Sequence, residues 1–526
     1  MDKLHGAMAV GRLAEISARN SAPTSAGQGV ASAAEGDDKS LESWQEPGPY
    51  DPAGRLRSWQ ERRAAGKAVR SRVPRAAHAE WQPPADRPDP VSTLLASNQG
   101  RQGELLPLRM ARMAASPFAF LRGSAAVMAW DLAHLPTTAV PVVLAGDAHL
   151  NNFGLYGTPQ REVVFDLNDF DETTVGPWEW DLKRLLASVN VVARANEYPA
   201  RQRRRAVMDC VRAYRENAAR LQGMGVMDIW YQHAFPGAKH SLVKWELKSH
   251  DVFEQAVRHA QQNTSERLLP RVARQQADGH WRFVADPPTL TRVDDATADA
   301  VVAALTEYVE TLTPERRFMM KRYGVADVAH RVVGVGSVGT RAYLVLLFGA
   351  GAADPLFLQV KEALRPALAG LVPALPPHLS HEGRRVVFGQ RFLQASSDVL
   401  LGWTSIADRP FYVRQMRNMK GSLPLASLAW GAFHSYSWAC GALLARAHAR
   451  TGDIAKIAGY CGNAKALDRA LADFAEAYAD QTERDHAALV AAIKQGRVAA
   501  ARKTAPGSAA NDSLAGSVRG TVQASE

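Results

Sequence analysis

The chain has 526 residues, of which 46% are hydrophobic and 22% are charged, as is typical of a globular protein. Its longest apolar runs fall well short of the ~20 residues that a membrane-spanning helix needs. We therefore expect no membrane partner. Three widely spaced cysteines argue against a disulfide scaffold or a cysteine-based zinc site, so we expect a reducing, cytoplasmic setting. The formal charge of +10 is scattered and lacks interleaved aromatic residues, which argues against nucleic-acid binding.

The two ends of the chain differ in composition from its middle. Residues 1–50 and the tail after 502 contain few large apolar side chains, so we expect both to be disordered. Residues 47–90 mix proline with basic residues and are predicted to form an arm or linker. Because the N-terminal segment has no apolar core and carries acidic residues, it is not expected to be a secretory signal.

Between these ends, apolar spacing predicts helices first, then strands, then helices again. Short apolar runs bounded by turn residues predict strands at 141–145 and 163–165. From 329 to 416 the pattern becomes strand-like, apart from one helix near 379–395. The predicted helices of the rest lie at 110–113, 118–135, 182–195, 251–262, 294–312, 425–449 and 464–492, with a possible hairpin within 241–325. Segregated helices and strands indicate an α+β fold.

Polar side chains cluster directly after the two short strands. The loop AGDAHLNNFG holds Asp147, His149 and Asn152 within six residues of one another. The second strand leads into four acidic residues: Asp166, Asp169, Asp171 and Glu172. Phosphoryl transfer requires one carboxylate near the attacking hydroxyl, and a carboxylate with an amide oxygen to hold Mg²⁺. The cluster therefore favours a phosphotransferase site.

Each polar residue also has a plain structural interpretation. Asp147 could cap a turn, and Asn152 could adopt a left-handed turn conformation. Asp166 or Asp171 could pair with Arg184. His149 is expected to brace the loop by hydrogen bonding, because a lone histidine makes a poor zinc site.

A glycine-rich segment and a lysine follow much later in the chain. Gly334, Gly336 and Gly339 form G-x-G-x-x-G, and the residues after them predict a second strand rather than the helix of a dinucleotide site. Strand, glycines and strand are the kinase arrangement, in which the loop covers the phosphates. A third strand carries Lys361, for which Glu382 on the next helix is the expected partner. A lysine pointing to solvent from an edge strand is the alternative.

Three arginines near the start of the helical region, Arg109, Arg112 and Arg122, remain open to two interpretations. They could bind an anionic substrate, or they could tie helices to the acidic loop. The aromatic residues of GPWEW, Trp178 and Trp180, are expected in the core.

As a set, the segments GDAHLNNFG, NDFDE, GPWEWDLKRL, GVGSVGTR, QVKEA and ARAHARTGD resemble the bacterial family named domain of unknown function 2252. The resemblance spans roughly residues 90–492. The first two segments also resemble the catalytic loop and the metal-binding strand of aminoglycoside phosphotransferases. In kinases the glycines and the lysine precede the catalytic loop, whereas here they follow it. The resemblance therefore implies a two-lobed, kinase-like fold that is circularly permuted.

This resemblance implies roles for individual residues. Asp147 would be the catalytic base, Asn152 and Asp169 would hold the metal, and Asp166 is the rival to Asp169. Asp181 would steady the catalytic loop. The implied cofactors are ATP, or another nucleotide, and Mg²⁺, with a small-molecule or protein hydroxyl as acceptor. Transfer of AMP on the same fold, or nucleotide binding without catalysis, are the alternatives.

The same reasoning divides the chain into five parts. A disordered, basic arm would span 1–89, and a helical large lobe with the catalytic loop would span 90–325. A small β-rich nucleotide-binding lobe would follow at 326–424, with a hinge beside the nucleobase near its end. C-terminal helices at 425–500 would pack on the large lobe, and 501–526 would be a disordered tail.

Overall fold

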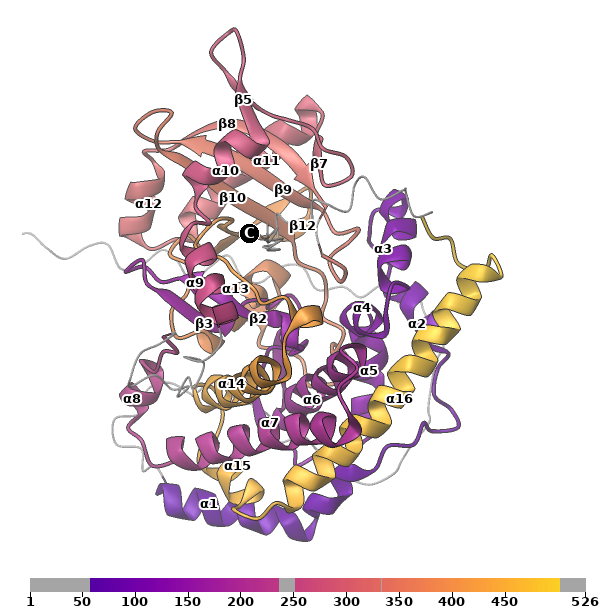
Figure 1. Cartoon of the computed structure of the whole chain (residues 1–526). Helices are drawn as coiled ribbons and strands as arrows, with labels where there is room; N and C mark the ends of the chain where they lie inside the picture. Colours follow the sequence, from indigo (N-terminus) through magenta and orange to yellow (C-terminus); the bar gives the residue numbers. More distant parts are fainter. Residues whose placement is uncertain (1–56, 236–250, 333, 502–526) are drawn as a thin grey trace, which may run out of the picture. The chain divides into compact units, whose positions relative to one another are not determined.

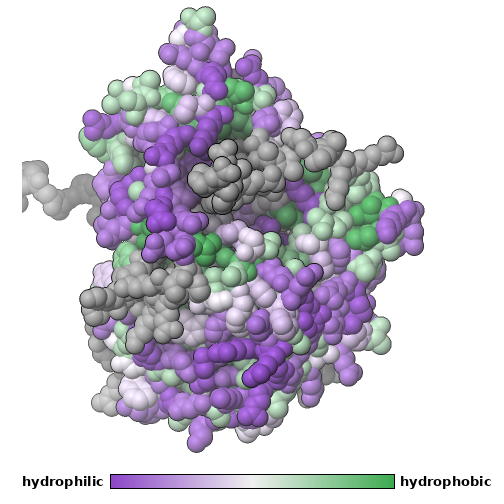
Figure 2. Space-filling model, viewed as in Figure 1, coloured by the Kyte–Doolittle hydropathy of each residue, from purple (hydrophilic) through white to green (hydrophobic). Residues whose placement is uncertain are grey.

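The computed structural model describes residues 57–235, 251–332 and 334–501, which form a group of helices and an antiparallel sheet (Figure 1). This combination confirms the predicted α+β class. None of the helices in the described ranges is long and apolar enough to cross a membrane. Hydrophilic residues cover most of the face seen in Figure 2.

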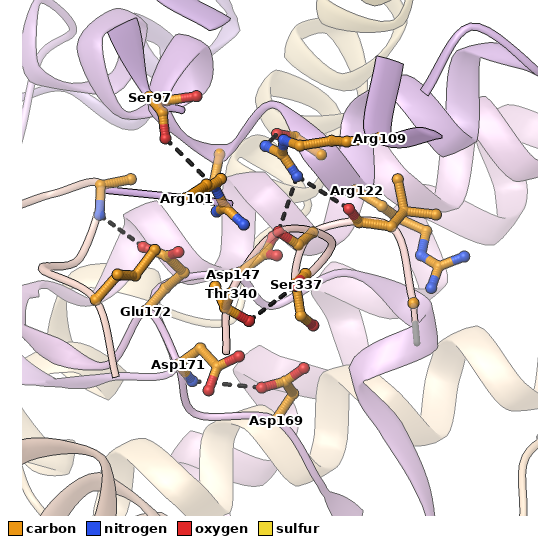
Figure 3. A pocket seen from close by; sticks show the side chains of 18 of the residues that line it. Ser97, Arg101, Arg109, Arg122, Asp147, Asp169, Asp171, Glu172, Ser337 and Thr340 are labelled. Carbon is orange, nitrogen blue, oxygen red and sulfur yellow. Dashed lines mark hydrogen bonds between the residues drawn. The ribbon is translucent and has the colours of Figure 1, made fainter. Parts of the chain in front are cut away.

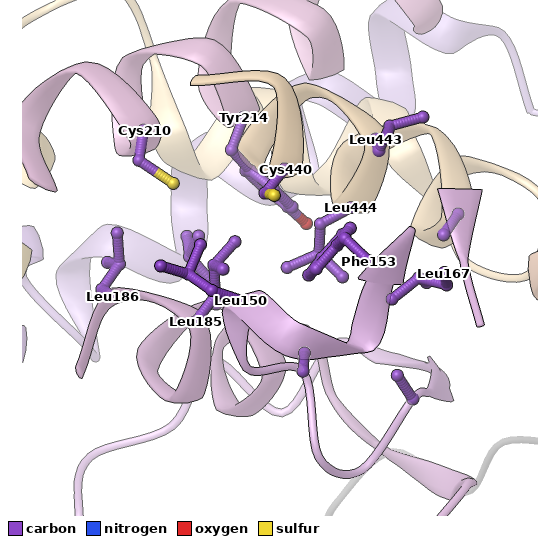
Figure 4. Packing of buried hydrophobic residues seen from close by; sticks show 14 of the residues in the cluster. Leu150, Phe153, Leu167, Leu185, Leu186, Cys210, Tyr214, Cys440, Leu443 and Leu444 are labelled. Carbon is purple, nitrogen blue, oxygen red and sulfur yellow. The ribbon is translucent and has the colours of Figure 1, made fainter. Parts of the chain in front are cut away.

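Helices from both ends of the described chain pack around one large core. α14 (Trp430–Ala449) lies along α7 (Ala200–Leu221), and α16 (Ala466–Lys494) lies along α6 (Trp178–Ala195). Figure 4 shows side chains of α6, α7 and α14 packed against the segment that begins at Leu150. The smaller helices of this part are α2 (Pro90–Ala96), α3 (Leu106–Met113), α4 (Pro117–Gly123), α5 (Ala125–Ala133), α8 (Val226–Trp230) and α15 (Ile454–Cys461).

Two short antiparallel strand pairs position the acidic loops. β1 (Pro141–Leu144) pairs with β4 (Thr174–Pro177), and β2 (Phe153–Gly157) pairs with β3 (Val163–Leu167). The chain passes from β1 to β2 through residues 145–152 and returns from β3 to β4 through 168–173. Both loops thus connect the same two strand pairs. They must therefore run beside each other, although the β2–β3 hairpin separates them in the sequence.

The second half of the chain forms a six-stranded antiparallel sheet in the order β11-β12-β10-β9-β8-β7. The glycine-rich segment connects β8 to β9, and Lys361 lies on β10. Helix α13 (Glu382–Leu393) separates β10 from β11 in sequence. The strands are β7 (Leu290–Arg292), β8 (Gly324–Arg331), β9 (Ala342–Phe348), β10 (Pro355–Glu362), β11 (Gly402–Ile406) and β12 (Arg409–Gln415).

Alternate residues of these strands face two different environments, because side chains alternate across a sheet. One face is apolar and packs on α11 (Asp295–Glu310), with Val345, Leu358 and Val413 at the contact. The other face packs on α10 (Ser265–Val272) and on Phe283, through residues such as Leu344 and Phe357.

Most of the predicted elements are present. The helix expected near 379–395 is α13, and the hairpin expected within 241–325 is β5 (Ala273–Gln275) with β6 (Trp281–Phe283). The helix expected at 251–262 is α9 (Asp251–Gln261), and α12 (Pro314–Met320) follows α11. Trp178 and Trp180 are buried, as predicted.

The predicted N-terminal arm is wrong for residues 57–89, while 1–56 and 502–526 lie outside the described residues. α1 (Trp59–Ala68) packs against α15 so closely that a Cβ atom on Gly66 would lie 1.8 Å from the Lys456 carbonyl oxygen. Arg70 and Arg75 then donate to carbonyl oxygens at the end of α15, each at 2.9 Å. The basic residues that suggested a solvated arm instead cap a helix C-terminus.

Candidate active site

A cavity of about 500 Å³ lies where the two acidic loops meet the glycine loop (Figure 3). It is lined by acidic and amide side chains, by glycines and by arginines: Asp147, His149, Asn152, Asp169, Asp171, Glu172, Gly334, Gly336, Arg101, Arg109 and Arg122. More than 150 residues separate the acidic loops from the glycines. Six of the ten residues predicted for the site nevertheless share this cavity, and the four that do not line it are Asp166, Gly339, Lys361 and Glu382.

The loop 145–152 is fixed in place by hydrogen bonds to α6. Both carboxylate oxygens of Asp181 accept backbone hydrogen bonds, from Ala145 N at 2.7 Å and from Gly146 N at 3.0 Å. Gly146 has a φ of +80°, and a Cβ atom there would lie 1.9 Å from the Glu172 carbonyl oxygen. Only glycine allows the two acidic loops to approach this closely. Asp181 thus steadies the loop, as the family resemblance implied.

Asp147 is ionised and held from two sides. Arg184 Nε donates to Oδ1 at 2.8 Å, and His149 Nε2 lies 3.5 Å from Oδ2. Burial disfavours the charged carboxylate, but the nearby guanidinium groups, that of Arg184 above all, outweigh burial and lower the pKa of Asp147. Burial lowers the pKa of His149 to about 4, so this imidazole is neutral at neutral pH. His149 therefore lies beside the aspartate as a neutral group, and its Nδ1 is buried without a hydrogen-bond partner among the described residues. Bracing of the loop by hydrogen bonding stays a prediction.

Asn152 supplies a neutral oxygen next to these charges. Its Nδ2 donates to the Asp147 carbonyl oxygen at 2.8 Å, which fixes the orientation of the amide. Its amide oxygen accepts no hydrogen bond from the described residues and belongs to a side chain that lines the cavity.

The second loop concentrates negative charge at the cavity. Burial and the neighbouring Asp171 raise the pKa of Asp169, and burial likewise raises the pKa of Glu172. Such shifts mean that the ionised carboxylates lack enough positive charge nearby. Asp171 is the exception, because Lys361 outweighs its burial and lowers the pKa of Asp171.

These residues fit a hard divalent cation, judged by the chemistry of their donor atoms. Carboxylate oxygens of Asp169 and the amide oxygen of Asn152 are the ligand types that Mg²⁺ prefers. Within the described ranges, no three His, Cys, Asp or Glu side chains form a complete metal site. Mg²⁺ bound to a phosphorylated ligand uses one or two carboxylates and completes its shell with phosphate and water, so Asp169 and Asn152 are the residues that would hold such an ion.

The glycine loop is pinned by arginines of the helical region. Arg109 donates to the carbonyl oxygens of Val335 and Gly336 at 2.9 and 2.8 Å, and Arg112 donates to that of Gly334 at 2.6 Å. Neither of the two roles considered for these arginines included this contact. Sequence spacing gave no signal for it, because the partners are backbone oxygens more than 200 residues away.

Two of the glycines have conformations that disfavour other residues. Gly334 has a φ of +77° and Gly339 a φ of +90°, both in the left-handed region. Gly334 and Gly336 line the cavity, whereas Gly339 packs against the side chain of Arg101.

Lys361 does not pair with Glu382 as predicted. Its ammonium group forms an ion pair with Asp171, and Glu382 instead pairs with Arg385, three residues further along α13. Arg385 connects α13 to the acidic loop by donating to the Asp171 carbonyl oxygen at 2.9 Å. The lysine reaches the loop directly, because the loop lies under its face of the sheet.

Asp166 lies outside the cavity, although it is only three residues from Asp169. It is buried in an ion pair with Arg446 of α14 and accepts a hydrogen bond from Ala395 N at 3.2 Å. Asp169 is therefore the one of the two rival metal ligands that faces the cavity.

Comparison with known proteins gives a family but no activity. No curated protein and no solved structure matches the chain. The model of a family described as "Uncharacterized protein conserved in bacteria" matches residues 101–492, which include both acidic loops, the glycine loop and Lys361. The chain is a member of this family, domain of unknown function 2252 (DUF2252).

Proposed function

We propose that this chain is an ATP- and Mg²⁺-dependent phosphotransferase that transfers a phosphoryl group to a hydroxyl acceptor. The observation that carries the proposal is the shared cavity, which joins Asp147, Asn152 and Asp169 to the glycine loop. Phosphoryl transfer needs little covalent participation by the protein and depends on positioning and charge stabilisation. The cavity offers groups for both.

Asp147 would act on the acceptor. Its carboxylate orients the hydroxyl and takes the proton as the acceptor oxygen bonds to the γ-phosphorus of ATP. The bond from that phosphorus to the β,γ-bridging oxygen breaks, and ADP leaves with the electron pair. Arg184 keeps Asp147 ionised and aimed, so that the carboxylate is ready to accept a proton.

Asn152 and Asp169 would hold Mg²⁺, which would neutralise charge on the phosphate oxygens when bound. Backbone N–H groups of the glycine loop would cover the phosphates from the opposite side. Lys361 would reach them from β10, where it forms an ion pair with Asp171 of the second loop.

A permuted kinase-like architecture is part of this proposal. Along the sheet, a glycine loop joins two adjacent strands, the next strand carries the lysine, and a helix follows it. Kinases have the same succession of parts, but ahead of the catalytic loop rather than behind it. The helices at 425–500 pack on α6 and α7, which supports their assignment to the large lobe.

Titration calorimetry of the purified chain with ATP, ADP and GTP, with and without Mg²⁺, tests the proposal. We expect Mg²⁺-dependent binding of at least one nucleotide. Absence of binding at millimolar nucleotide would contradict it. Mass spectrometry of acceptors recovered from a reaction would then distinguish a gained phosphate from a gained AMP.

A further inference from the structure

Basic residues gather on the face of the six-stranded sheet that looks toward the acidic loops. Lys361 pairs in register with Tyr412, and Gln359 pairs with Arg414, so Lys361 and Arg414 lie on the same face. Ala329 and Gln359 are both opposite Leu344, which places Arg331, two residues beyond Ala329, on that face as well. Lys420 follows β12 by five residues and lies beside Arg414 and Arg331.

Among the described residues, one of these four cations has a carboxylate partner. Lys361 pairs with Asp171. Arg414 donates to two neutral oxygens, Gln359 Oε1 at 3.0 Å and the Asn168 carbonyl oxygen at 3.3 Å. Arg331 NH1 meets the sulfur of Met416 at 2.6 Å, and a thioether is a weak acceptor.

Lys420 has no side-chain partner within the described ranges. Its backbone carbonyl accepts from Asn263, but the ammonium group forms neither a hydrogen bond nor an ion pair with any described residue. The side chains of Lys420 and Arg331 are both half-buried rather than extended into solvent. Together with Arg414, which is also half-buried, they form a partly exposed basic site, which is called the recess below.

The carboxylates near this recess are already engaged. Asp398 accepts from the backbone N–H groups of Leu400 and Gln415, at 2.9 and 2.6 Å. Asp169 belongs to the cavity and faces the proposed metal. Burial, with Arg417 and Arg414 nearby, lowers the pKa of Arg331 to about 9. Burial and Arg414 likewise lower the pKa of Lys420. Tyr412 and the carboxylates of Asp169 and Asp171 outweigh burial and raise the pKa of Arg414. The positive charge that the described residues leave unbalanced therefore lies at Arg331 and Lys420.

We propose that this recess, formed by Arg331, Arg414 and Lys420, binds an oxyanion ligand of the phosphate type. A phosphate group would supply the oxygens that these donors lack, and arginine matches such oxygens in a planar fork. The oxyanion could belong to the phosphate chain of the nucleotide donor or to a separate phosphorylated compound, because the recess adjoins Asp169. The inference requires binding alone and no group transfer, so it can hold even if the proposed function fails.

Inorganic tripolyphosphate is a suitable probe, with calorimetry of the full chain in the absence of Mg²⁺. We expect wild type to bind it, and the double variant R331Q/K420Q to bind at least tenfold more weakly. K420R, which keeps the charge, and K321Q, which removes a lysine from an exposed position at the end of α12, should bind like wild type. Equal affinity of wild type and R331Q/K420Q, or no binding by wild type, would overturn the inference.

Thermal unfolding shows whether the double variant folds. Because two repelling cations are removed, its melting temperature should equal or exceed that of wild type. K420Q alone gives the same binding test if the double variant is unstable, since the Lys420 ammonium group forms no hydrogen bond or ion pair with any described residue.

Binding of Mg²⁺-ATP to the same variants identifies the source of the oxyanion. A parallel loss of ATP and tripolyphosphate affinity would show that the recess holds the donor's phosphates. Unchanged ATP affinity with lost tripolyphosphate affinity would show a separate phosphorylated ligand. Both results support the recess, and neither depends on Asp147.

Discussion

Two aspartates, Asp166 and Asp169, lie three residues apart and have opposite surroundings. Asp166 is buried against Arg446, whereas Asp169 faces the cavity next to another carboxylate. The sequence left them as rivals for the metal, because spacing alone does not tell which side of a strand end a residue faces. Their environments predict different effects of the same substitution.

D169N is expected to abolish the Mg²⁺ dependence of nucleotide binding and to leave stability nearly unchanged. D166N is the matched control, and should leave that dependence intact. It should reduce the free energy of unfolding by roughly 3–5 kcal/mol, since it strands a buried arginine. Calorimetry and urea unfolding measure the two effects. Loss of Mg²⁺ dependence in D166N alone would reverse the assignment.

D147N is expected to reduce phosphoryl transfer by about 10²–10⁴-fold, the usual contribution of a positioned general base. Nucleotide affinity should not change, because Asp147 faces the acceptor in the proposed mechanism. The ratio of the initial rates, measured at saturating ATP, checks the prediction. Undiminished turnover in D147N would show that another group takes the proton.

At the scale of elements, closely packed glycines join α1 to α15. A Cβ on Gly66 would lie 1.8 Å from the Lys456 carbonyl oxygen, and one on Gly459 would lie 2.1 Å from that of Arg63. G66A should therefore lower the free energy of unfolding by about 1–3 kcal/mol, through overpacking. At an exposed position inside a helix, replacing glycine by alanine would instead raise the free energy of unfolding. A64S, on the exposed side of α1, should change stability by less than ~0.5 kcal/mol.

The segment after α1 should make stability depend on pH. His78 is buried, its Nε2 lies 2.8 Å from the Tyr460 hydroxyl, and burial keeps its pKa well below the ordinary value. The unfolded chain then binds more protons below pH ~6.5, so stability should fall as pH decreases from there. H78Q should lose part of this dependence, and H280Q, at an exposed turn, should keep it. Identical pH profiles for wild type and H78Q would contradict this explanation.

The local sequence pattern predicted helices and strands well, but it predicted poorly which side chains contact each other. Strands at 141–145 and 163–165 and the helix near 379–395 follow from periodicity, which is a property of neighbouring residues. The ion pair of Lys361 with Asp171 joins residues 190 positions apart. Nothing in the sequence around Lys361 distinguishes that partner from Glu382. Residues 57–89 were misassigned for the same reason, because their partners lie near residue 460.

At the scale of the molecule, the chain brings chemistry from its two halves to one cavity. The first half supplies carboxylates and an amide, and the second supplies the glycine loop. Lys361 does not line the cavity, but its ion pair with Asp171 joins the second half to the acidic loop. Arg109 and Arg112 bind the two together by holding the carbonyl oxygens of the glycine loop. The inverted order of the parts is visible in the sequence, whereas these cross-links are not.

The central claim is that one nucleotide contacts both halves. Hydrogen–deuterium exchange of the full chain, with and without Mg²⁺-ATP, tests it directly. We predict slower exchange both in peptides covering 146–152 and 168–172 and in peptides covering 334–341. Protection confined to one half, or no protection at saturating nucleotide, would contradict the account.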